Sequence, residues 1–469
     1  MTTFSLIAMS SHFGSSTQQP EAGKAPSLAD EEAVKNDNID EDLFEVGYCY
    51  SPSYQLKNLC SKLESNEIYA IDTAGLTMDV DCCKLLAVAL WKNKSLQFVS
   101  IENQGPISDQ AVEILCKGLQ HHCDKLNTLS FCVESLSQES LRKIVTAVGS
   151  VKQLFCRVLS ARTNTFDLSP VVKAISSKLE RLTLYCTHRL GTDESVDELL
   201  NAAKTCPNLL SLHIRNFPLD QKSLAALKSL LETTSSLRTL SLINGDVCGK
   251  ALKILESSLI DHPTLCELVL EDDHRSLQRW AASDSGVTVV ANVLKSPATK
   301  LTRLSLHHTA VGENGAVLMA NALRRNTTLV HLDLRRTGIR QSGLVALGNA
   351  ISHNRTLEKL WLLNALKERT PPSKEGLQAW VDGLRQNTTL TSIQEYGGST
   401  VFWTKRDEDV VDLFNQVRLL VLRNSSSSSS SSKDWREVKA TCLQELVENN
   451  NFNATLWPLK LHTNPPAAA

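Results

Sequence analysis

The chain has 469 residues, of which 42% are apolar and 21% are charged, and its formal net charge is -2. This composition is typical of a folded protein, and the length allows more than one ordinary domain. The nearly balanced charge excludes a general attraction to nucleic acid or to anionic membranes, so neither is expected as a partner.

Two further properties of the chain bear on its compartment. No apolar run approaches the roughly 18–20 residues needed to cross a bilayer, and no basic residue precedes the short apolar stretch near Met1, which makes a poor secretory signal. None of the thirteen cysteines forms a C-x-x-C pair. We therefore expect reduced thiols, no metal and no cofactor, in the cytoplasm or, as the alternative, in the nucleus.

Residues 1–45 are predicted to form a disordered tail rich in serine and acidic residues. Within it, an acidic run extends from Asp30 to Glu45. This run is either a solubilising segment or a docking segment for a basic partner. Residues 46–65 are expected to form an N-terminal cap.

A recurring L-x-x-L-x-L pattern in residues 66–395 is the main feature of the chain. From Leu96 onward, five of the ten spacings between successive copies equal 28 residues. The copies begin at Leu96, Leu126, Val151, Leu179, Leu209, Leu237, Leu265, Leu301, Leu329, Leu357 and Leu390, with a weak first copy at Ile68. A fixed period of this length predicts a solenoid.

Each copy continues into a segment with helical spacing. Leu224, Leu227 and Leu231, for example, fall at i, i+3 and i+7 and would lie along one side of a helix. A strand followed by a helix, repeated, predicts βα units whose strands align in parallel. The expected fold class is therefore α/β, a curved solenoid of about eleven or twelve units with a concave sheet and helices on the convex side.

The period and segments such as residues 329–339, LVHLDLRRTGI, resemble the ribonuclease-inhibitor class of leucine-rich repeats. This class includes ribonuclease inhibitor, the repeat regions of NOD-like receptors and the Ran GTPase-activating protein. The resemblance covers about residues 66–395. It implies a fold rather than a function, because these relatives do different things. In one departure from the class, Thr309 and Thr337 replace the usual Asn after the strand.

After the repeats, residues 396–424 are expected to form a C-terminal cap helix and residues 425–432 a poly-serine linker without structure. Residues 433–469 are predicted to hold a short amphipathic helix that either packs back on the cap or binds a partner. Two copies carry longer loops, at 271–285 and 363–376, on the rim where strands lead into helices. Such insertions mark either a binding side or neutral variation.

Catalytic motifs are missing from the sequence. It has no phosphate-binding glycine loop, no H-E-x-x-H and no G-x-S-x-G, so we predict a non-enzymatic protein. The main alternative is a regulator of a small GTPase, as the resemblance to the Ran GTPase-activating protein implies. Members of that family present an arginine in a strand-to-helix loop near the N-terminal end. The corresponding loops here, 72–81 and 102–110, hold neither Arg nor Lys.

The position three residues before the start of a copy holds Asn, Cys, Thr or His in eight of the copies. It holds Asn93, Cys123, Cys206, Thr234, His262, Asn326, Asn354 and Asn387. Its recurrence indicates a structural role in the helix-to-strand turn, for cysteine as well as for asparagine. The N-x-[ST] sequons at the last three asparagines follow from the repeat, and we do not expect them to be glycosylated.

The residues between the leucines of each copy should point out of the concave sheet. In the C-terminal third they include seven candidate partner-binding residues: Arg303, His307, His331, Arg335, Arg336, Lys359 and Trp361. Arginine and tryptophan are enriched at interface hot spots, and clustered cations favour an anionic ligand. We therefore predict a protein-binding scaffold that holds an acidic protein or peptide here. The alternative interpretation is a solvated basic face.

Overall fold

The computed structural model describes residues 56–103, 105–122, 125–149, 151–158, 168–186, 196–217, 219–244, 249–271, 285–362, 372–394 and 408–427. Within these ranges, no helix is long and apolar enough to span a membrane. The predicted tail at 1–45, the segment 433–469 and most of both long loops lie outside them.

The described elements alternate between strands and helices. The strands are β1 (Ala70–Asp72), β2 (Phe98–Ile101), β3 (Thr128–Cys132), β4 (Gln153–Val158), β5 (Arg181–Cys186), β6 (Ser211–Arg215), β7 (Thr239–Ile243), β8 (Glu267–Glu271), β9 (Arg303–Ser305), β10 (His331–Asp333), β11 (Lys359–Trp361) and β12 (Ser392–Gln394). The helices are α1 (Leu56–Glu64), α2 (Val80–Lys92), α3 (Asp109–Leu119), α4 (Gln138–Val148), α5 (Ser169–Ala174), α6 (Asp197–Ala203), α7 (Gln221–Thr233), α8 (Gly249–Ile260), α10 (Ser285–Lys295), α11 (Gly312–Leu323), α12 (Gln341–Ile351), α13 (Lys374–Gln386) and α14 (Glu408–Ser427). Two short 3-10 turns, η3 (Gln120–His122) and η4 (Val133–Ser135), follow α3 and β3.

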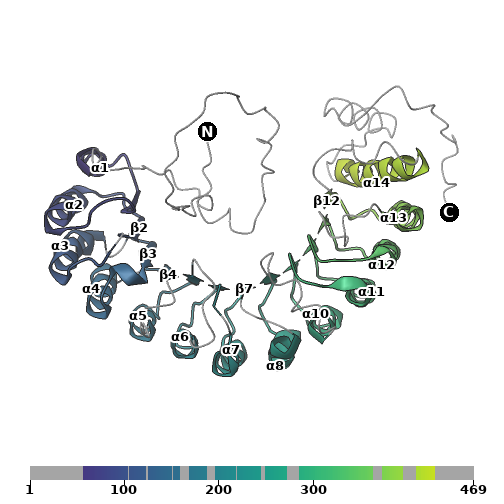
Figure 1. The fold of residues 1–469 in the computed structure, drawn as a ribbon, viewed down its shortest axis with the longest axis horizontal. Coiled ribbons are helices and arrows are strands. Elements are labelled where there is room, and N and C mark those ends of the chain that lie inside the picture. The colour runs from purple at the N-terminus through teal and green to yellow at the C-terminus, as the bar shows by residue number, and fades with distance from the viewer. Residues whose placement is uncertain are drawn as a thin grey trace, which may run out of the picture.

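The strands form one parallel twelve-stranded sheet in sequence order, which confirms the predicted solenoid. In Figure 1 the sheet lines the inside of a horseshoe and the helices form its outer layer. The register follows the repeat, since Leu304 pairs with Leu332 and Leu332 with Leu360, each 28 residues apart. A bulky helix outside and a narrow strand inside make each unit wedge-shaped, so stacked units curve.

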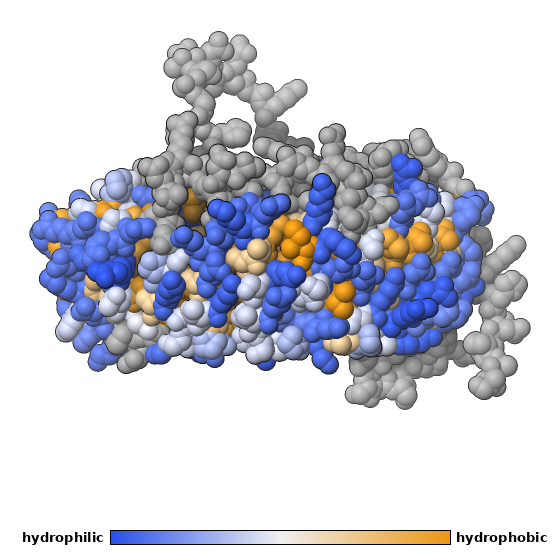
Figure 2. Space-filling model, turned by 90° about the horizontal axis from the view of Figure 1, so that it is seen from below, coloured by the Kyte–Doolittle hydropathy of each residue, from blue (hydrophilic) through white to orange (hydrophobic). Residues whose placement is uncertain are grey.

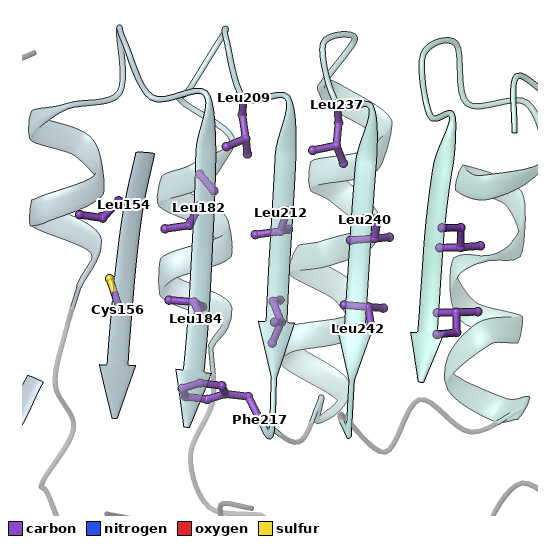
Figure 3. Packing of buried hydrophobic residues seen from close by; sticks show 14 of the residues in the cluster. Leu154, Cys156, Leu182, Leu184, Leu209, Leu212, Phe217, Leu237, Leu240 and Leu242 are labelled. Carbon is purple, nitrogen blue, oxygen red and sulfur yellow. The ribbon is translucent and has the colours of Figure 1, made fainter. Parts of the chain in front are cut away.

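The core lies between the sheet and the helices and is built from the repeated leucines. Leu154, Leu182, Leu212 and Leu240 form one row across four neighbouring strands and are fully buried (Figure 3). Because side chains alternate along a strand, the intervening residues face the concave side. Each fully buried leucine contributes about 1.5–3 kcal/mol, which a single unit could not obtain alone.

Several helices begin at a side chain that caps the free backbone N–H groups. In α2, the Asp79 carboxylate accepts a hydrogen bond from the backbone N–H of Cys82 at 2.7 Å. The same arrangement occurs at Ser108, Ser137, Asp220 and Ser373. Such caps fix the residue at which each helix starts, because the backbone N–H groups of the first turn have no hydrogen-bond acceptor within the helix.

Buried asparagines hold the turns that lead from helix to strand. The Asn354 Oδ1 atom accepts hydrogen bonds from the backbone N–H groups of Thr356 and Leu357, and its Nδ2 donates to the carbonyls of Leu323 and Asn326. Asn93, Asn326 and Asn387 repeat this pattern. The side chains therefore link successive units, and the sequon asparagines are buried in the folded chain.

A second set of equivalent positions, just past the strands, has left-handed backbone. Asn216, Asn244, His308 and Arg336 have φ between 55° and 65°. Asparagine tolerates this conformation, whereas histidine and arginine adopt it at a cost. Neighbouring members are connected, since the Asn244 Nδ2 donates to Asn216 Oδ1 at 2.6 Å. Contacts between successive units thus offset the strain of the turns.

The two ends of the described solenoid carry helices. α1 packs against α2, and α14 packs against α13 and β12. α14 continues to Ser427, so the prediction that the serine run has no structure is wrong for its first three residues. The Ser425 hydroxyl donates to the Leu422 carbonyl at 2.8 Å, and serine costs little in a helix that packing already stabilises.

Candidate functional site

The candidate site starts from one column of residues on the concave sheet. Arg303, His331 and Lys359 occupy equivalent positions on β9, β10 and β11 and are paired directly in the register. Arg303 and Lys359 are exposed, whereas His331 between them is half-buried. At a strand spacing of about 4.8 Å, the two exposed cations originate from backbones roughly 10 Å apart.

The next column, Ser305, Asp333 and Trp361, is buried, and here the sequence-based expectation fails. Trp361 was expected to face solvent, but only 6% of it is exposed. The His331 ring meets the indole edge-on with centroids 4.3 Å apart, and the Arg335 guanidinium lies 4.5 Å from the indole centroid. These two neighbours enclose the indole, so Trp361 forms part of the floor of the site.

Arg335 is also buried, with 4% of it exposed, although the sequence pattern predicts a solvent-facing cation. Its Nε and Nη2 atoms donate to the Asp333 carboxylate at 2.9 and 2.7 Å. The Asp333 Oδ1 also accepts from the backbone N–H of Arg335 at 2.9 Å. The charge of Arg335 is therefore compensated inside the chain, and it does not add to a free basic surface.

Carboxylates of the chain face two more of the candidate cations. Glu267, paired with Arg303 in the register, has its Oε1 4.0 Å from Arg303 Nη1. Glu271 lies 3.9 Å from His307 Nδ1 and accepts a hydrogen bond from the Ser305 hydroxyl at 2.6 Å.

The surroundings of Glu271 favour its charged form. Burial alone would raise the pKa of Glu271, but the hydrogen bonds from His307 and Ser305, with the charges of His307 and Arg335, outweigh it and lower that pKa. A fixed negative charge thus lies at the edge of the site, beside β9.

Arg336, the remaining candidate, is half-buried at a left-handed position. Its Nη1 lies 2.9 Å from His308 Nε2. Because a guanidinium can only donate, this nitrogen of His308 acts as the acceptor and carries no proton. Arg336 therefore helps to join two turns and is less available to a partner than Arg303 or Lys359.

Sequence reasoning located the seven residues on adjacent units but did not recognise the neighbouring carboxylates as partners of the cations. Glu267, Glu271 and Asp333 each bind or face a candidate cation. The register contains the signal, since Glu267 pairs with Arg303. The solvent-facing cations of the site are reduced to Arg303 and Lys359, beside a buried network.

The cysteines within the described ranges are buried or half-buried free thiols. Burial raises the pKa of Cys206 to about 11, while a hydrogen bond from Thr205 opposes this shift. Such a thiol is a poor nucleophile at neutral pH. In the part of the chain that the structure describes, no group of three or more His, Cys, Asp or Glu residues is arranged to hold a metal ion.

The loops relevant to GTPase activation lie at the N-terminal end of the sheet. Arg157 of β4 reaches one of them from a strand, a contact that the sequence did not indicate. Its Nη1 atom lies 2.6 and 2.7 Å from the two Glu102 carboxylate oxygens. The guanidinium is thus engaged by a carboxylate of the same surface, and this arrangement offers no specific support for GTPase activation.

Comparisons with known proteins agree with this architecture. No family model matches the chain. NACHT, LRR and PYD domains-containing protein 3 of Homo sapiens is 24% identical over 255 residues, which cover 53% of this chain and 21% of that protein. This similarity agrees with the parallel strands paired at a 28-residue register. The fold is a leucine-rich-repeat solenoid.

Other known proteins are similar to this leucine-rich-repeat chain. NACHT, LRR and PYD domains-containing protein 14 of Mus musculus is 27% identical over 262 residues, or 54% of this chain and 25% of that protein. The chain thus spans a quarter or less of the length of these curated relatives. A chain in the crystal structure of the Rad7 and Elc1 complex in yeast has a TM-score of 0.40 at 17% identity, over 74% of this chain and 84% of that one.

Proposed function

We propose that this leucine-rich-repeat protein is a non-enzymatic scaffold that binds an acidic segment of a partner protein on its concave face, at β9–β11. The observation that carries the proposal is the pair of exposed cations, Arg303 and Lys359, in register on either side of β10. Two carboxylates three residues apart lie on one side of a polyproline-II peptide, about 9 Å from each other, and would match these cations.

The buried network beneath these cations suits a rigid binding surface. Asp333, Arg335 and Trp361 fix one another through a two-point ion pair and a cation–π contact. His331 lies on the indole between the two exposed cations. A partner would then meet a preformed floor, which lowers the entropy cost of binding.

A charge-reversal experiment with a matched control tests this proposal. The probe is a fluorescein-labelled synthetic peptide of about twelve residues, rich in Pro and with Glu at every third position, and its Gln counterpart is the uncharged control. Fluorescence anisotropy should show that Arg303→Glu with Lys359→Glu weakens binding at least about tenfold. The matched variant is Arg142→Glu with Lys253→Glu, which makes the same change in net charge on exposed residues of the convex helices α4 and α8.

Salt provides a second readout of the same site. Binding through two exposed ion pairs should weaken as salt rises, because screening acts over about 8–10 Å near physiological ionic strength. Equal losses for the concave and convex variants would show a non-specific charge effect. Binding of the Gln peptide as tight as that of the Glu peptide would also reject the proposal.

A further inference from the structure

A second, separate surface lies at the N-terminal end of the solenoid, on helix α2. Most of the convex face seen in Figure 2 is hydrophilic, with apolar residues scattered over it. Six large apolar side chains are exposed within the described residues, and three of them, Leu85, Val88 and Trp91, lie on α2. A fourth, Tyr69, directly precedes β1. Solvent reaches about half of each of the three α2 side chains, at 50%, 54% and 55%.

The three α2 residues form one stripe. They are spaced three residues apart and so extend over about 9 Å along the helix, on the face opposite the buried Leu86 and Leu90. Trp91 is fixed at one end by the His121 ring, which stacks on it with centroids 3.7 Å apart and planes inclined by 9°. A rigid, exposed tryptophan beside two aliphatic residues is typical of an interface hot spot.

A basic hollow adjoins the stripe at its tryptophan end. The hollow has a volume of about 490 Å³ and is lined by Tyr69, Lys94, Ser95, Gln97, Lys125 and Asn127. These six residues include two lysines and no carboxylate. Lys125 Nζ donates to the Lys94 backbone carbonyl at 2.9 Å, which positions the Lys125 ammonium group beside Lys94. An anionic group of a ligand would complement this charge.

The charges of α2 argue against a second copy of the chain as the occupant. Lys84 and Lys92 each lie four residues from Val88, at the centre of the stripe. An antiparallel two-fold pairing about Val88 would place Lys84 opposite Lys92 of the other copy, and a parallel pairing would oppose each lysine to itself. Both arrangements bring like charges together. Acidic residues of a different protein would instead meet these lysines favourably.

We infer that α2 and the adjoining hollow bind an acidic amphipathic helix of a partner protein. The apolar face of that helix covers Leu85, Val88 and Trp91, as in helix-in-groove recognition, and a carboxylate near its end enters the hollow between Lys94 and Lys125. The intrachain ion pairs of Lys84 with Asp81 and of Lys92 with Glu64 are exposed, so exchanging them for contacts with the partner costs little. This surface is independent of the concave site.

Peptide display on the intact protein tests the inference. A library of random peptides of about 16 residues, long enough to form a helix on binding, is selected against the full chain. It is counter-selected against the full-chain variant Leu85→Ser, Val88→Ser, Trp91→Ser. Enriched peptides should combine apolar residues at i, i+3 or i+4 and i+7 with an excess of Asp and Glu. Failure to enrich, or enrichment of peptides without this pattern, overturns the inference.

The affinity of the most enriched peptide for variants of the protein then shows how much the apolar stripe and the basic hollow each contribute to binding. Trp91→Ala should weaken binding at least about tenfold, as for a hot spot, and Lys94→Glu with Lys125→Glu should weaken it to a similar degree. The controls are Ile254→Ala, which truncates an exposed apolar residue of α8, and Lys222→Glu with Lys250→Glu on α7 and α8. The controls should bind like the parent, and all variants should keep its thermal midpoint. Equal losses in controls and test variants contradict the inference.

Two further measurements test for other occupants of the stripe. Sedimentation of the full chain shows whether it self-associates, and loss of a dimer in Trp91→Ala would assign the stripe to a second copy. A synthetic peptide of residues 433–450 is the second probe. Its binding in competition with the enriched peptide would assign the stripe to this chain's own sequence. Either result overturns the proposed partner helix without affecting the concave site.

Discussion

The Asp333 carboxylate accepts three hydrogen bonds from the Arg335 side chain and a fourth from its backbone N–H in a buried position, although the two residues are only two positions apart. Asp333 ends strand β10, and Arg335 turns back over the sheet to meet it and to cover Trp361. A buried pair of this kind organises its surroundings more than it stabilises them, because desolvation of both charges offsets much of their attraction. Removing one partner alone is the costly change.

Arg335→Ala should therefore lower the free energy of unfolding by about 3–5 kcal/mol, since it leaves the Asp333 carboxylate buried without its counter-charge. Urea unfolding followed by circular dichroism measures the change. Arg303→Ala, at a side chain that is 52% exposed, is the control and should change stability by less than about 0.5 kcal/mol. Replacing the whole pair, with Asp333→Leu and Arg335→Met, should cost less than Arg335→Ala alone. The reverse order would contradict this account of the pair.

Asn354→Ala should destabilise the protein by about 2–4 kcal/mol. The amide makes four hydrogen bonds that satisfy buried backbone groups of two successive units, and alanine leaves these groups without partners. Chemical unfolding is again the measurement. The control is Asn349→Ala on the exposed side of α12, which should have an effect within about 0.5 kcal/mol. Similar values for both variants would mean that the buried asparagines are not structural.

His213, on the concave side of β6, should make stability dependent on pH. Burial, together with the positive charge of Arg181, lowers the pKa of His213 to about 4. The unfolded chain, with a pKa near 6.5, binds a proton between these values while the folded chain does not. The contribution of neutral His213 to the free energy of unfolding is therefore complete above about pH 6.5 and is lost as the pH falls toward 4.

The pH-dependent contribution of His213 to stability should be on the order of 2 kcal/mol. This value is smaller than the full pKa shift would give, because the ring is only half-buried. Unfolding free energies of the parent and of His213→Gln, measured between about pH 4 and pH 7.5, test this prediction. The difference between the two proteins should shrink or reverse on acidification. A difference that is constant with pH would show that His213 does not titrate as described.

The thiols should react with a disulfide reagent in order of their exposure. Among the cysteines that the structure describes, Cys60 and Cys266 are half-buried and should react first in the native protein, whereas Cys156 is buried and burial strongly raises its pKa. All thirteen cysteines should titrate in denaturant without reductant, and metal analysis should find no stoichiometric zinc. Mass spectrometry of labelled peptides gives the order. Native Cys156 reacting as fast as Cys266 would count against the packing of β4.

Nearly all of the fold could be predicted from the sequence. The copies that begin at Leu301, Leu329 and Leu357 predicted both the strands and their register, because a fixed period leaves only one way to align parallel strands. The weak copy at Ile68 also leads into a strand, β1. The position that holds Asn354 was recognised as structural from its recurrence alone. Each of these predictions depends on a pattern repeated many times.

The candidate site was less predictable because it depends on single residues. Alternation along the strand correctly placed Trp361 on the concave side, but exposure depends on what neighbouring side chains do. The guanidinium of Arg335 covers the indole only because Asp333 holds it there. This is a local turn conformation that periodicity does not encode. The exposed apolar face of α2 was not predicted, because the helical spacing in the other copies marks the side that packs on the sheet and says nothing about the opposite side.

Every strand of this sheet pairs only with the strands of the preceding and following units, so most long-range contacts join residues about 28 positions apart. The loop that must close to add one unit is therefore nearly the same at each step, and its entropy cost does not grow with the number of units already formed. Folding can begin at any well-paired neighbours and spread in both directions. A gene for such a chain can gain a unit by duplication without creating a harder folding problem for the units around it.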